Sequence, residues 1–516
     1  MLPDRNARMD SMPSPAAPPF HVRASLPGWK RWLPAAAFLL YAVLLAHYMG
    51  AYAGGSDSSG YLNNARMLAQ GRVTIPMRLV PDPHPETLPL YTHVPLGFIS
   101  NQDHVTLTPT YPMGLPLLIM GLAQITGWEH APGLVLGLHA LFGLGLVYQL
   151  GRATGLGAGW AWLGVLMLAT SPLYLLMSLQ VMSDVPALVW VTAAIYFAWV
   201  SRERTWLALP AGMALATAVL VRPTDLLALV PVAVAVGLCW RRWVLLALGA
   251  LPGACFQGGF NLIAYGSIFT TGYGAVGGIF GPQYVLPTLI HYAVWLPVVL
   301  TPLCLLALGL PALWRRQPRI MAVLAAWVLV FLVFYLFYLH THQEWWYLRF
   351  LMPAFPSLIV AALLVAQVLI TRPGLSLRPW WLAAAGTAIL TYGISWSRHF
   401  DVFTIGHGEK VYPETAAWLQ THLPANAVVA SMQTTGALLY YTQFTFFRWD
   451  MMSAEDFQRI AAACATAGRP IYATLYPFEI EEKEWAAFEK HLTDRWTRIG
   501  AVRHVSIWRY DPSTAP

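Results

Sequence analysis

The side chains best suited to chemistry in this sequence are a few carboxylates and arginines at the ends of long apolar stretches. Asp57 lies in the segment SDSSGYLNNARMLAQG (56–71), which starts three residues after the first such stretch. Tyr61, Ala65 and Leu68 recur at helical spacing, which predicts a helix that Asp57 opens. On spacing alone an N-cap role for Asp57 is favoured, because Asp is a preferred N-cap residue. At the boundary between an apolar stretch and a large loop, the same carboxylate could act as a general base.

Three further carboxylates are candidates for the same chemistry. Asp184 opens the apolar stretch SDVPALVW (183–190), either as a cap or interfacial residue or as a second acid in the same cavity. Glu86 and Asp103 lie in the long polar segment after the first apolar stretch. Each is more often a solvated loop residue, and the functional interpretation is a helper carboxylate.

Two arginines could hold an anion. Arg222 lies in VRPTDLL (221–227), at a turn between two apolar stretches. An arginine at membrane depth is costly without a partner, so we expect Arg222 to contact a lipid phosphate, or else Asp225 or a headgroup. Arg349, in WWYLRFLMPAFP (345–356), either extends to the membrane surface or contacts the phosphate.

Other motifs give no cofactor or metal site. His340, His342 and Glu344 form an HxHxE cluster, for which interfacial packing is favoured because i, i+2 spacing does not put both imidazoles on one helical face. The glycines between 258 and 281 lack the GK[ST] ending of a phosphate-binding loop. The four cysteines have no metal-ligand spacing. The sequence therefore predicts no metal and no cofactor.

The composition defines the elements that must position these side chains. The chain has 516 residues, of which 57% are hydrophobic and 11% charged, whereas soluble proteins have about 25% charged residues. The apolar runs are continuous over about 20 residues, which predicts transmembrane helices. The net charge of +7 does not indicate nucleic-acid binding, because the basic residues are spread between the apolar runs.

We predict an α-helical polytopic membrane protein with about eleven transmembrane helices, interfacial helices in the first outer loop and a small C-terminal α/β soluble domain. Residues 1–29 are a disordered cytoplasmic tail, 30–400 the transmembrane domain with its first outer loop at 54–130, and 401–516 the α/β domain. The stretch 113–126 is too short to span and is expected to be interfacial or re-entrant. The predicted spans are 32–53, 131–150, 158–178, 184–200, 206–221, 224–240, 243–264, 289–313, 320–339, 350–370 and 380–397.

The arginine distribution predicts the orientation. With the N-terminus in the cytoplasm, the short loops that carry most arginines are all cytoplasmic, as the positive-inside rule requires. Eleven spans then put the C-terminal domain outside, where we expect it to pack over the outer loops and help bind acceptor. The cytoplasmic arginines are Arg152, Arg202, Arg204, Arg241, Arg242, Arg315, Arg316, Arg319, Arg372 and Arg378.

The C-terminal domain has an alternating helix and strand pattern. Ser453, followed three residues later by Asp456, predicts a capping box at the start of a helix that ends near Thr466. The predicted helices are 413–423, 453–466 and 480–492, and the predicted strands are 427–432, 444–448, 471–475 and a terminal pair within 496–510.

Several motifs in order over residues 30–400 resemble the C-type, polyprenyl-phosphate-sugar-dependent glycosyltransferases. That superfamily includes the protein O-mannosyltransferases and the aminoarabinose transferases (family 39-like). The family's outer loop often has an acidic pair, whereas Ser58 follows Asp57 here, so the helper carboxylate is unassigned. The motifs are Asp57 with Tyr61 and Ala-x-x-Leu-x-x-Gly, YPMGLPLLIMGLAQITG (111–127), SDVPALVW, VRPTDLL, NLIAYGSIFTTGY (261–273) and WWYLRFLMPAFP.

The resemblance implies transfer of a sugar from a polyprenyl-phosphate carrier to an acceptor hydroxyl on the outer face of a bacterial inner (plasma) membrane. The acceptor would be a lipid, a glycan or a protein of the cell envelope. It implies catalytic carboxylates among Asp57, Asp184, Glu86 and Asp103, with Asp57 as the base. It further implies lipid-phosphate contacts from Arg222 and Arg349, and a substrate pocket that includes Tyr61, Tyr111 and Tyr273.

Two other classes of protein remain as alternatives. A transporter usually has ionisable residues or broken helices at mid-membrane, often in two similar halves. In this sequence the charges cluster at span ends, and no internal repeat is evident. A non-catalytic membrane scaffold with an outer binding domain is disfavoured only by the long loop that carries Asp57.

Overall fold

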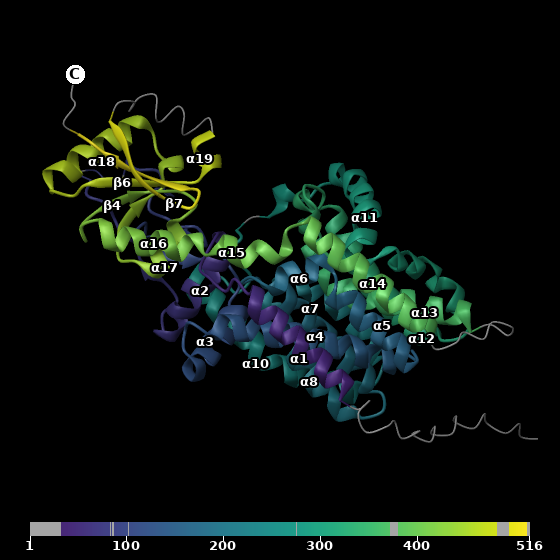
Figure 1. The fold of residues 1–516 in the computed structure, drawn as a ribbon. Helices are drawn as coiled ribbons and strands as arrows, with labels where there is room; N and C mark the ends of the chain where they lie inside the picture. The colour runs from purple at the N-terminus through teal and green to yellow at the C-terminus, as the bar shows by residue number, and fades with distance from the viewer. Residues whose placement is uncertain are drawn as a thin grey trace, which may run out of the picture.

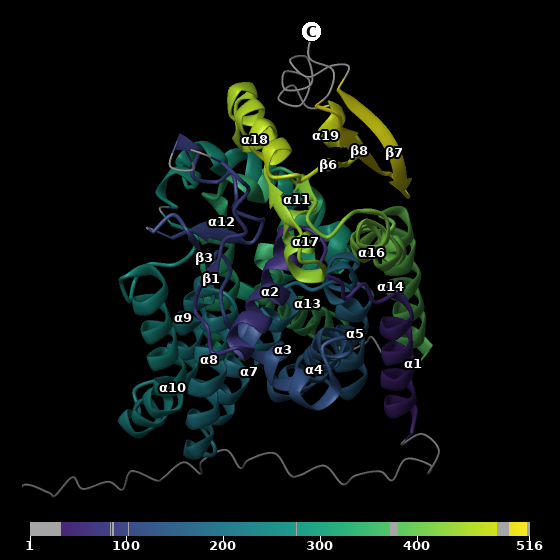
Figure 2. The same cartoon turned by 90° about the vertical axis from the view of Figure 1, so that its left-hand side faces the viewer.

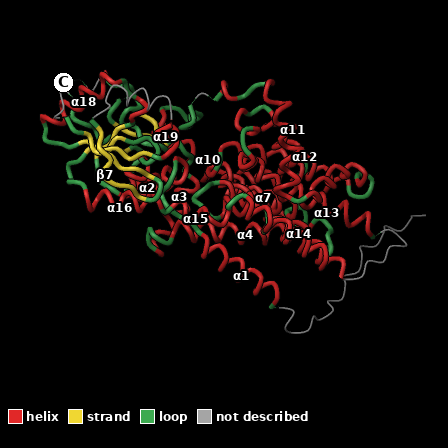
Figure 3. Tube along the Cα trace, turned by 45° about the horizontal axis from the view of Figure 1, so that its top comes forward, coloured by secondary structure: helices red, strands yellow, loops and turns green. Residues whose placement is uncertain are grey.

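The computed structural model describes residues 32–82, 84, 87–101, 103–274, 276–371, 380–481 and 495–512. Helices fill most of the molecule, and a five-stranded sheet lies at one end of it (Figure 3). The sheet belongs to a C-terminal domain that sits on one end of the helix bundle, below called the domain end (Figure 1). The predicted fold class, a polytopic helical membrane protein with a small C-terminal α/β domain, is confirmed.

Every predicted span coincides with one helix or with two consecutive helices, because a continuous apolar run in lipid must satisfy its backbone internally. Trp327, Phe331 and Phe355 are fully buried in the core that these helices share. The helices of the bundle are α1 (Leu33–Tyr48), α4 (Ala131–Ala153), α5 (Ala158–Ala169), α6 (Pro172–Ser178), α7 (Asp184–Val200), α8 (Ala208–Val221), η4 (Pro223–Ala228), α9 (Leu229–Val236), α10 (Trp240–Tyr265), α11 (Val285–Leu300), η7 (Pro302–Leu313), α12 (Pro318–Leu336), η9 (Trp345–Ala354), α13 (Phe355–Ile370) and α14 (Trp380–His399).

Several predicted spans are not single straight helices. Among the described residues, five helices are long and apolar enough to cross a membrane, and α5 with α6 forms a sixth span bent by 62°. The bend follows from Pro172, which cannot continue the hydrogen-bonding of α5, and Ser171 caps the new helix by accepting from the Tyr174 N–H. The predicted span 289–313 is interrupted at Thr301, whose φ is 64°. A count of eleven therefore includes helices of 10–17 residues.

The long loop after α1 folds against the bundle. It contains α2 (Ser56–Ala69) and a small antiparallel sheet of β1 (Ile75–Pro76), β3 (Thr106–Pro109) and β2 (Phe98–Ser100). The short helix α3 (Gly114–Thr126) covers much of the stretch predicted to be interfacial, and it contacts α2, α4 and α8.

The C-terminal domain has the sheet order β5-β4-β6-β8-β7, with β5, β4 and β6 parallel and β6, β8 and β7 antiparallel. The predicted strands are confirmed, and so is the capping box of Ser453 and Asp456. The helix predicted over 480–492 overlaps α19 only at its start, and residues 482–494 lie outside the described residues. The elements are α15 (Ile405–Glu409), α16 (Val411–His422), β4 (Val428–Ala430), α17 (Thr435–Tyr441), β5 (Thr445–Phe447), α18 (Ala454–Thr466), β6 (Ile471–Leu475), α19 (Pro477–Glu481), β7 (Trp496–Val502) and β8 (Val505–Tyr510).

Helix α17, which the sequence did not predict, joins the C-terminal domain to α2 (Figures 1 and 2). The Asn63 side chain donates to the Gly436 carbonyl (2.9 Å), and Arg66 donates to the Tyr440 carbonyl (2.7 Å) while lying over that residue's ring. Gly436 is required by the close approach, since a Cβ there would lie 2.1 Å from the Ser59 Oγ. The C-terminal domain therefore rests directly on the helix that carries Asp57.

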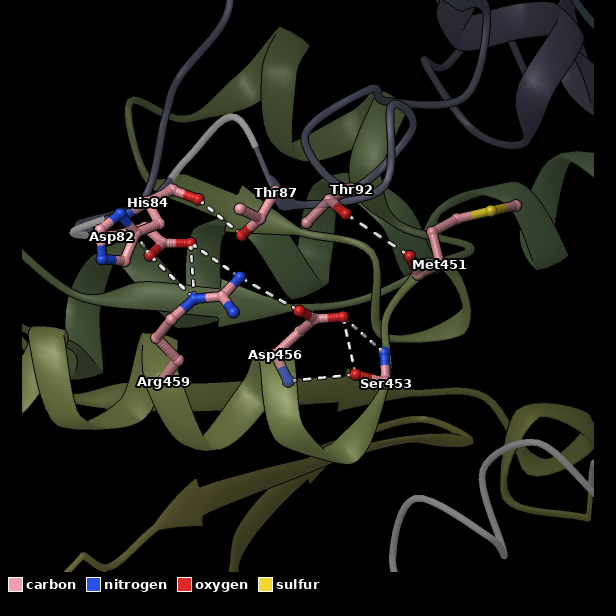
Figure 4. Close-up of polar contacts among 8 residues, drawn as sticks. All are labelled: Asp82, His84, Thr87, Thr92, Met451, Ser453, Asp456 and Arg459. Atoms are coloured by element: carbon pink, nitrogen blue, oxygen red, sulfur yellow. Dashed lines mark hydrogen bonds and ion pairs between the residues drawn. The ribbon is translucent and has the colours of Figure 1, made fainter.

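A second contact joins the long loop to α18 (Figure 4). The Arg459 guanidinium lies between the carboxylates of Asp82 and Asp456, each 3.1 Å away. The Thr92 hydroxyl donates to the Met451 carbonyl at 3.5 Å. The long loop is thus fixed to the C-terminal domain at two separate places.

Helix α1 runs along the bundle away from the domain end (Figure 2). Its last residues approach the C-terminal domain, where Gly50 packs against Gly406. The N-terminal end of α1 lies at the opposite end of the bundle (Figure 2). The start of α1 and the C-terminal domain therefore lie at opposite ends of the helices.

Candidate active site

Two ion pairs lie together at the domain end of the bundle. Asp57 Oδ2 is 2.9 Å from Arg349 Nη1, and Asp184 Oδ1 is 2.5 Å from Arg222 Nη2. Arg222 also donates from Nη1 to the Arg349 carbonyl at 3.4 Å. Four side chains singled out from the sequence therefore form one cluster, below called the ion-pair cluster.

Helix α2 holds Asp57 without using it as a cap. Gly55 is the N-cap residue, and Asp57 is the second residue of the helix, with no side-chain capping bond. The N-cap interpretation is therefore wrong. A carboxylate in the first turn is still favoured by the helix dipole, and Arg349 supplies its charged partner.

The second pair is deeper than the first. Asp184 begins α7 and is 1% exposed, and Arg222 ends α8 in extended backbone and is 11% exposed. The alternative partner for Arg222, Asp225, is also buried, but its carboxylate makes no hydrogen bond within the described residues. In the outer pair, Asp57 is 26% and Arg349 18% exposed. A substrate would therefore reach Asp57 and Arg349 first.

The three tyrosines predicted for a substrate pocket lie side by side next to the cluster. The Tyr61 hydroxyl is 2.9 Å from Ser183 Oγ, and the Tyr111 hydroxyl is 2.7 Å from Ser56 Oγ. The ring centroids of Tyr61 and Tyr111 are 5.1 Å apart, and those of Tyr111 and Tyr273 are 6.3 Å apart. Because Tyr273 is 46% exposed, it marks the open side of this group.

An aromatic residue beneath the two arginines was missed by the sequence analysis. The Phe350 ring lies 5.7 Å from the Arg222 guanidinium and 5.3 Å from that of Arg349. Aromatic rings attract cations in this range, so Phe350 holds both guanidinium groups in place. Phe350 and Arg349 belong to η9, a 3₁₀ helix of 10 residues, which is uncommonly long for this helix type. In the sequence, the position of Phe350 directly after Arg349 was the only indication that this ring could contact the arginines.

The remaining candidates do not join the cluster. Asp103 is exposed, and its carboxylate accepts hydrogen bonds from the Val105 N–H and from Thr106. These bonds hold the pKa of Asp103 below its usual range. Glu86 lies outside the described residues. His340 contacts Gln343 at 2.8 Å, and no group of three or more His, Cys, Asp or Glu side chains in the described part of the chain is arranged to hold a metal ion.

A second titratable group faces the segment that leads into α2. A Cβ on Gly54 would lie 1.8 Å from the Glu409 Oε2, so this carboxylate packs directly against the backbone three residues before Asp57. Burial raises the pKa of Glu409 to about 7. Folding therefore disfavours the ionised form of Glu409.

We expect this carboxylate to weaken the fold as the pH rises. The contribution of Glu409 to stability is largest below about pH 4.5, where this group is protonated in both states, and about 1–3 kcal/mol of it is lost as the pH rises to about 7. Glu409→Gln should remove this loss. The measurement is the melting temperature of the purified protein at pH 5 and pH 8, with Glu414→Gln, an exposed carboxylate nearby, as the control. Equal pH dependence in Glu409→Gln and the wild type would contradict the prediction.

The described features define an integral membrane protein with a charged, tyrosine-ringed cluster at one end of its helices. No family model and no curated protein matches the sequence. Solved structures do match the fold. ArnT from Cupriavidus metallidurans, apo and bound to undecaprenyl phosphate, has TM-scores of 0.58 and 0.56 at 15% identity, over 95% of this chain and 99% of ArnT.

The folds of two further enzymes are similar to that of this chain. The apo oligosaccharyltransferase of Archaeoglobus fulgidus has a TM-score of 0.51 at 10% identity, over 89% of this chain and 71% of its own. The arabinofuranosyltransferase AftD from Mycobacteria has a TM-score of 0.54 at 15% identity, over 94% of this chain and 40% of its own. The chain therefore has the fold of the C-type glycosyltransferases, which confirms at the level of the fold the resemblance seen in the sequence.

Proposed function

We propose that the protein is a membrane glycosyltransferase that moves a sugar from a polyprenyl-phosphate carrier to an acceptor hydroxyl. The observation that carries the proposal is the ion-pair cluster: a partly exposed carboxylate and two arginines meet beside three tyrosines. One reaction centre then contains a base for the acceptor and cations for a phosphate. Undecaprenyl phosphate bound to ArnT, which has the same fold, supports a lipid phosphate as the ligand.

The proposed reaction assigns a role to each charge. Asp57 takes the proton of the acceptor hydroxyl, and the acceptor oxygen bonds to the anomeric carbon of the sugar. The bond between that carbon and the phosphate oxygen breaks, and the carrier phosphate leaves with the electron pair. Arg349 and Arg222 stabilise the charge on the phosphate. Asp184, buried against Arg222, keeps that guanidinium oriented.

The contact between Asp57 and Arg349 suggests how donor binding prepares the base. The guanidinium of Arg349 donates a hydrogen bond to the Asp57 carboxylate at 2.9 Å and so occupies one of its oxygens. A bound phosphate competes for Arg349, and the Asp57 carboxylate is then free to contact the acceptor hydroxyl. Proton removal from the acceptor thus follows binding of the sugar donor.

The transporter alternative is supported by one observation, the bent span of α5 and α6. Broken helices at mid-membrane form ion sites in transporters. The break here lies at Thr170 and Ser171, whose side chains are neutral and hydrogen-bonded to the backbone. The two ion pairs of the cluster lie instead at the domain end, which favours the enzyme.

We infer that the N-terminus is cytoplasmic and that the C-terminal domain lies outside a bacterial inner membrane, because arginine-rich loops remain in the cytoplasm. The acceptor would then be an envelope lipid, glycan or protein. A periplasmic phosphatase reporter fused after Tyr510 is expected to be active, and the same reporter inserted after Arg316 inactive. Activity only in the second fusion would overturn this orientation.

The test of the function is an assay of the purified protein with a panel of polyprenyl-phosphate sugars. We expect release of polyprenyl phosphate from at least one donor in the presence of envelope extract as acceptor. Heat-inactivated protein is the control. Transport of the donor across vesicles without cleavage of the sugar–phosphate bond would instead support the transporter.

A further inference from the structure

A small cavity lies beside the ion-pair cluster and shares two of its tyrosines. Tyr111 and Tyr273 line it together with Pro223, which directly follows Arg222, and with Gln257 and Asn261 of α10. The space open to the centre of a water molecule is about 10 Å³, which is enough for one water-sized polar group. The lining residue Pro223 directly follows, along the chain, the arginine that we assign to the carrier phosphate.

The amide groups at the back of the cavity have only one possible orientation. The Ile268 carbonyl can only accept a hydrogen bond, so the Asn261 Nδ2 must be the group that donates to it at 3.1 Å. The Asn261 Oδ1 is then the acceptor for the Gln257 Nε2, at 2.7 Å. These two hydrogen bonds leave the Gln257 Oε1 as the atom without a hydrogen-bond donor. It is buried and has no hydrogen-bond partner among the described residues.

A buried acceptor without a donor is unfavourable, so a hydrogen-bond donor is expected to occupy the cavity. Of the hydroxyls that line the cavity, Tyr265 donates to the Pro109 carbonyl and Tyr111 bonds to Ser56, and none of the others donates to Gln257 Oε1. Gly272 keeps the covering loop close, because a Cβ there would lie 2.4 Å from the Pro109 and Thr110 carbonyls. No described residue donates a hydrogen bond to Gln257 Oε1, so a group from outside the described chain is the expected partner.

We propose that Gln257 and Asn261 form a subsite for one hydroxyl group of the transferred sugar, whose O–H donates to Gln257 Oε1. This inference rests on the proposed function. A polyprenyl-phosphate sugar has three parts. The polyprenyl hydrocarbon and the ionised phosphate diester have no hydrogen-bond donor. Only the hydroxyl groups of the sugar can therefore donate to Gln257 Oε1. Because the sugar is attached to the phosphate, a subsite lined by Pro223 and by two of the tyrosines beside the ion-pair cluster is within its reach. Gln257 is thus a specificity-determining residue.

The test compares the donor found in the panel with analogues that each lack one hydroxyl group. The wild type is expected to prefer the parent over one of these analogues by at least about 10²-fold in kcat/KM, because a site built to bond a hydroxyl rejects a substrate without it. In Gln257→Met, which keeps the side-chain length, that preference should fall to a few-fold. The ratio is measured on a single preparation, so it does not depend on the fraction of folded protein.

The matched control is Gln367→Met. Gln367 lies on α13, and both of its amide atoms bond to the protein, at the Gly157 N–H and the Gly155 carbonyl. This variant should lose stability but keep the wild-type preference for the parent sugar donor over the deoxy analogue. Equal use of all deoxy analogues by the wild type, or an unchanged preference in Gln257→Met, would show that only water fills the cavity and would overturn the subsite. If the wild type cleaves no polyprenyl-phosphate sugar, the proposed function fails and the subsite fails with it.

Discussion

Asp57→Asn is expected to lower turnover by roughly 10²–10⁴-fold, the contribution of a positioned general base. The amide keeps the shape of the carboxylate and can still accept a hydrogen bond from Arg349, but it cannot take a proton. The fold should be nearly unaffected, because Asp57 caps nothing and its ion pair is partly exposed. Turnover and melting temperature of the same preparation measure both effects.

Asp103→Asn is the matched control for this experiment. Its carboxylate is exposed and binds only its own turn, so turnover should be that of the wild type. Normal turnover in Asp57→Asn would remove the base assignment and direct the search to Asp184. If Asp57→Asn lowers the melting temperature so far that unfolding alone explains the lost turnover, Asp57 has a structural role instead.

Arg222→Ala is expected to give the largest loss of stability, about 3–5 kcal/mol, because it leaves the buried Asp184 carboxylate without its partner. Arg222→Lys keeps the charge but loses the planar fork that reaches a phosphate and Asp184 together. We expect it to fold and to lower kcat/KM for the donor by about 10–100-fold. Thermal unfolding and donor kinetics are the measurements.

A double variant separates the two roles of Arg222. Arg222→Met with Asp184→Leu removes both buried charges, so stability should return close to the wild-type value. Binding of polyprenyl phosphate should remain weak, because the cation is gone. Wild-type affinity for polyprenyl phosphate in this stable double variant would rule out Arg222 as a phosphate ligand.

The spans were predictable because a helix that crosses lipid must present apolar side chains over its whole length. The breaks within them were not. Pro172 was visible, but other prolines in spans, such as Pro252, are tolerated within a continuous helix. In the C-terminal domain, the strands and the Ser453 cap were predictable from local pattern. Helix α17 was missed, since its seven residues are too few to display a helical period.

The members of the ion-pair cluster were predictable, but their pairing was not. Charged residues at span ends stand out because membrane burial makes them costly. Asp57 and Arg349, however, are 292 residues apart, and the sequence does not encode which arginine each carboxylate meets. The choice of Asp184 over Asp225 for Arg222 depends on how α7 packs against α8. The role of Phe350 likewise depends on the course of η9.

The close contact between Gly436 and α2 has a consequence for biosynthesis. Gly436 follows its partner Asn63 by 373 residues, so at 5–20 residues per second the ribosome needs about 20–75 s to supply it. Until then Asn63 and Arg66 lack their carbonyl partners, and α2 rests mainly on α3 and on its own loop. In the nascent protein the helix that carries Asp57 therefore lacks part of its support until the C-terminal domain has been synthesised and folded.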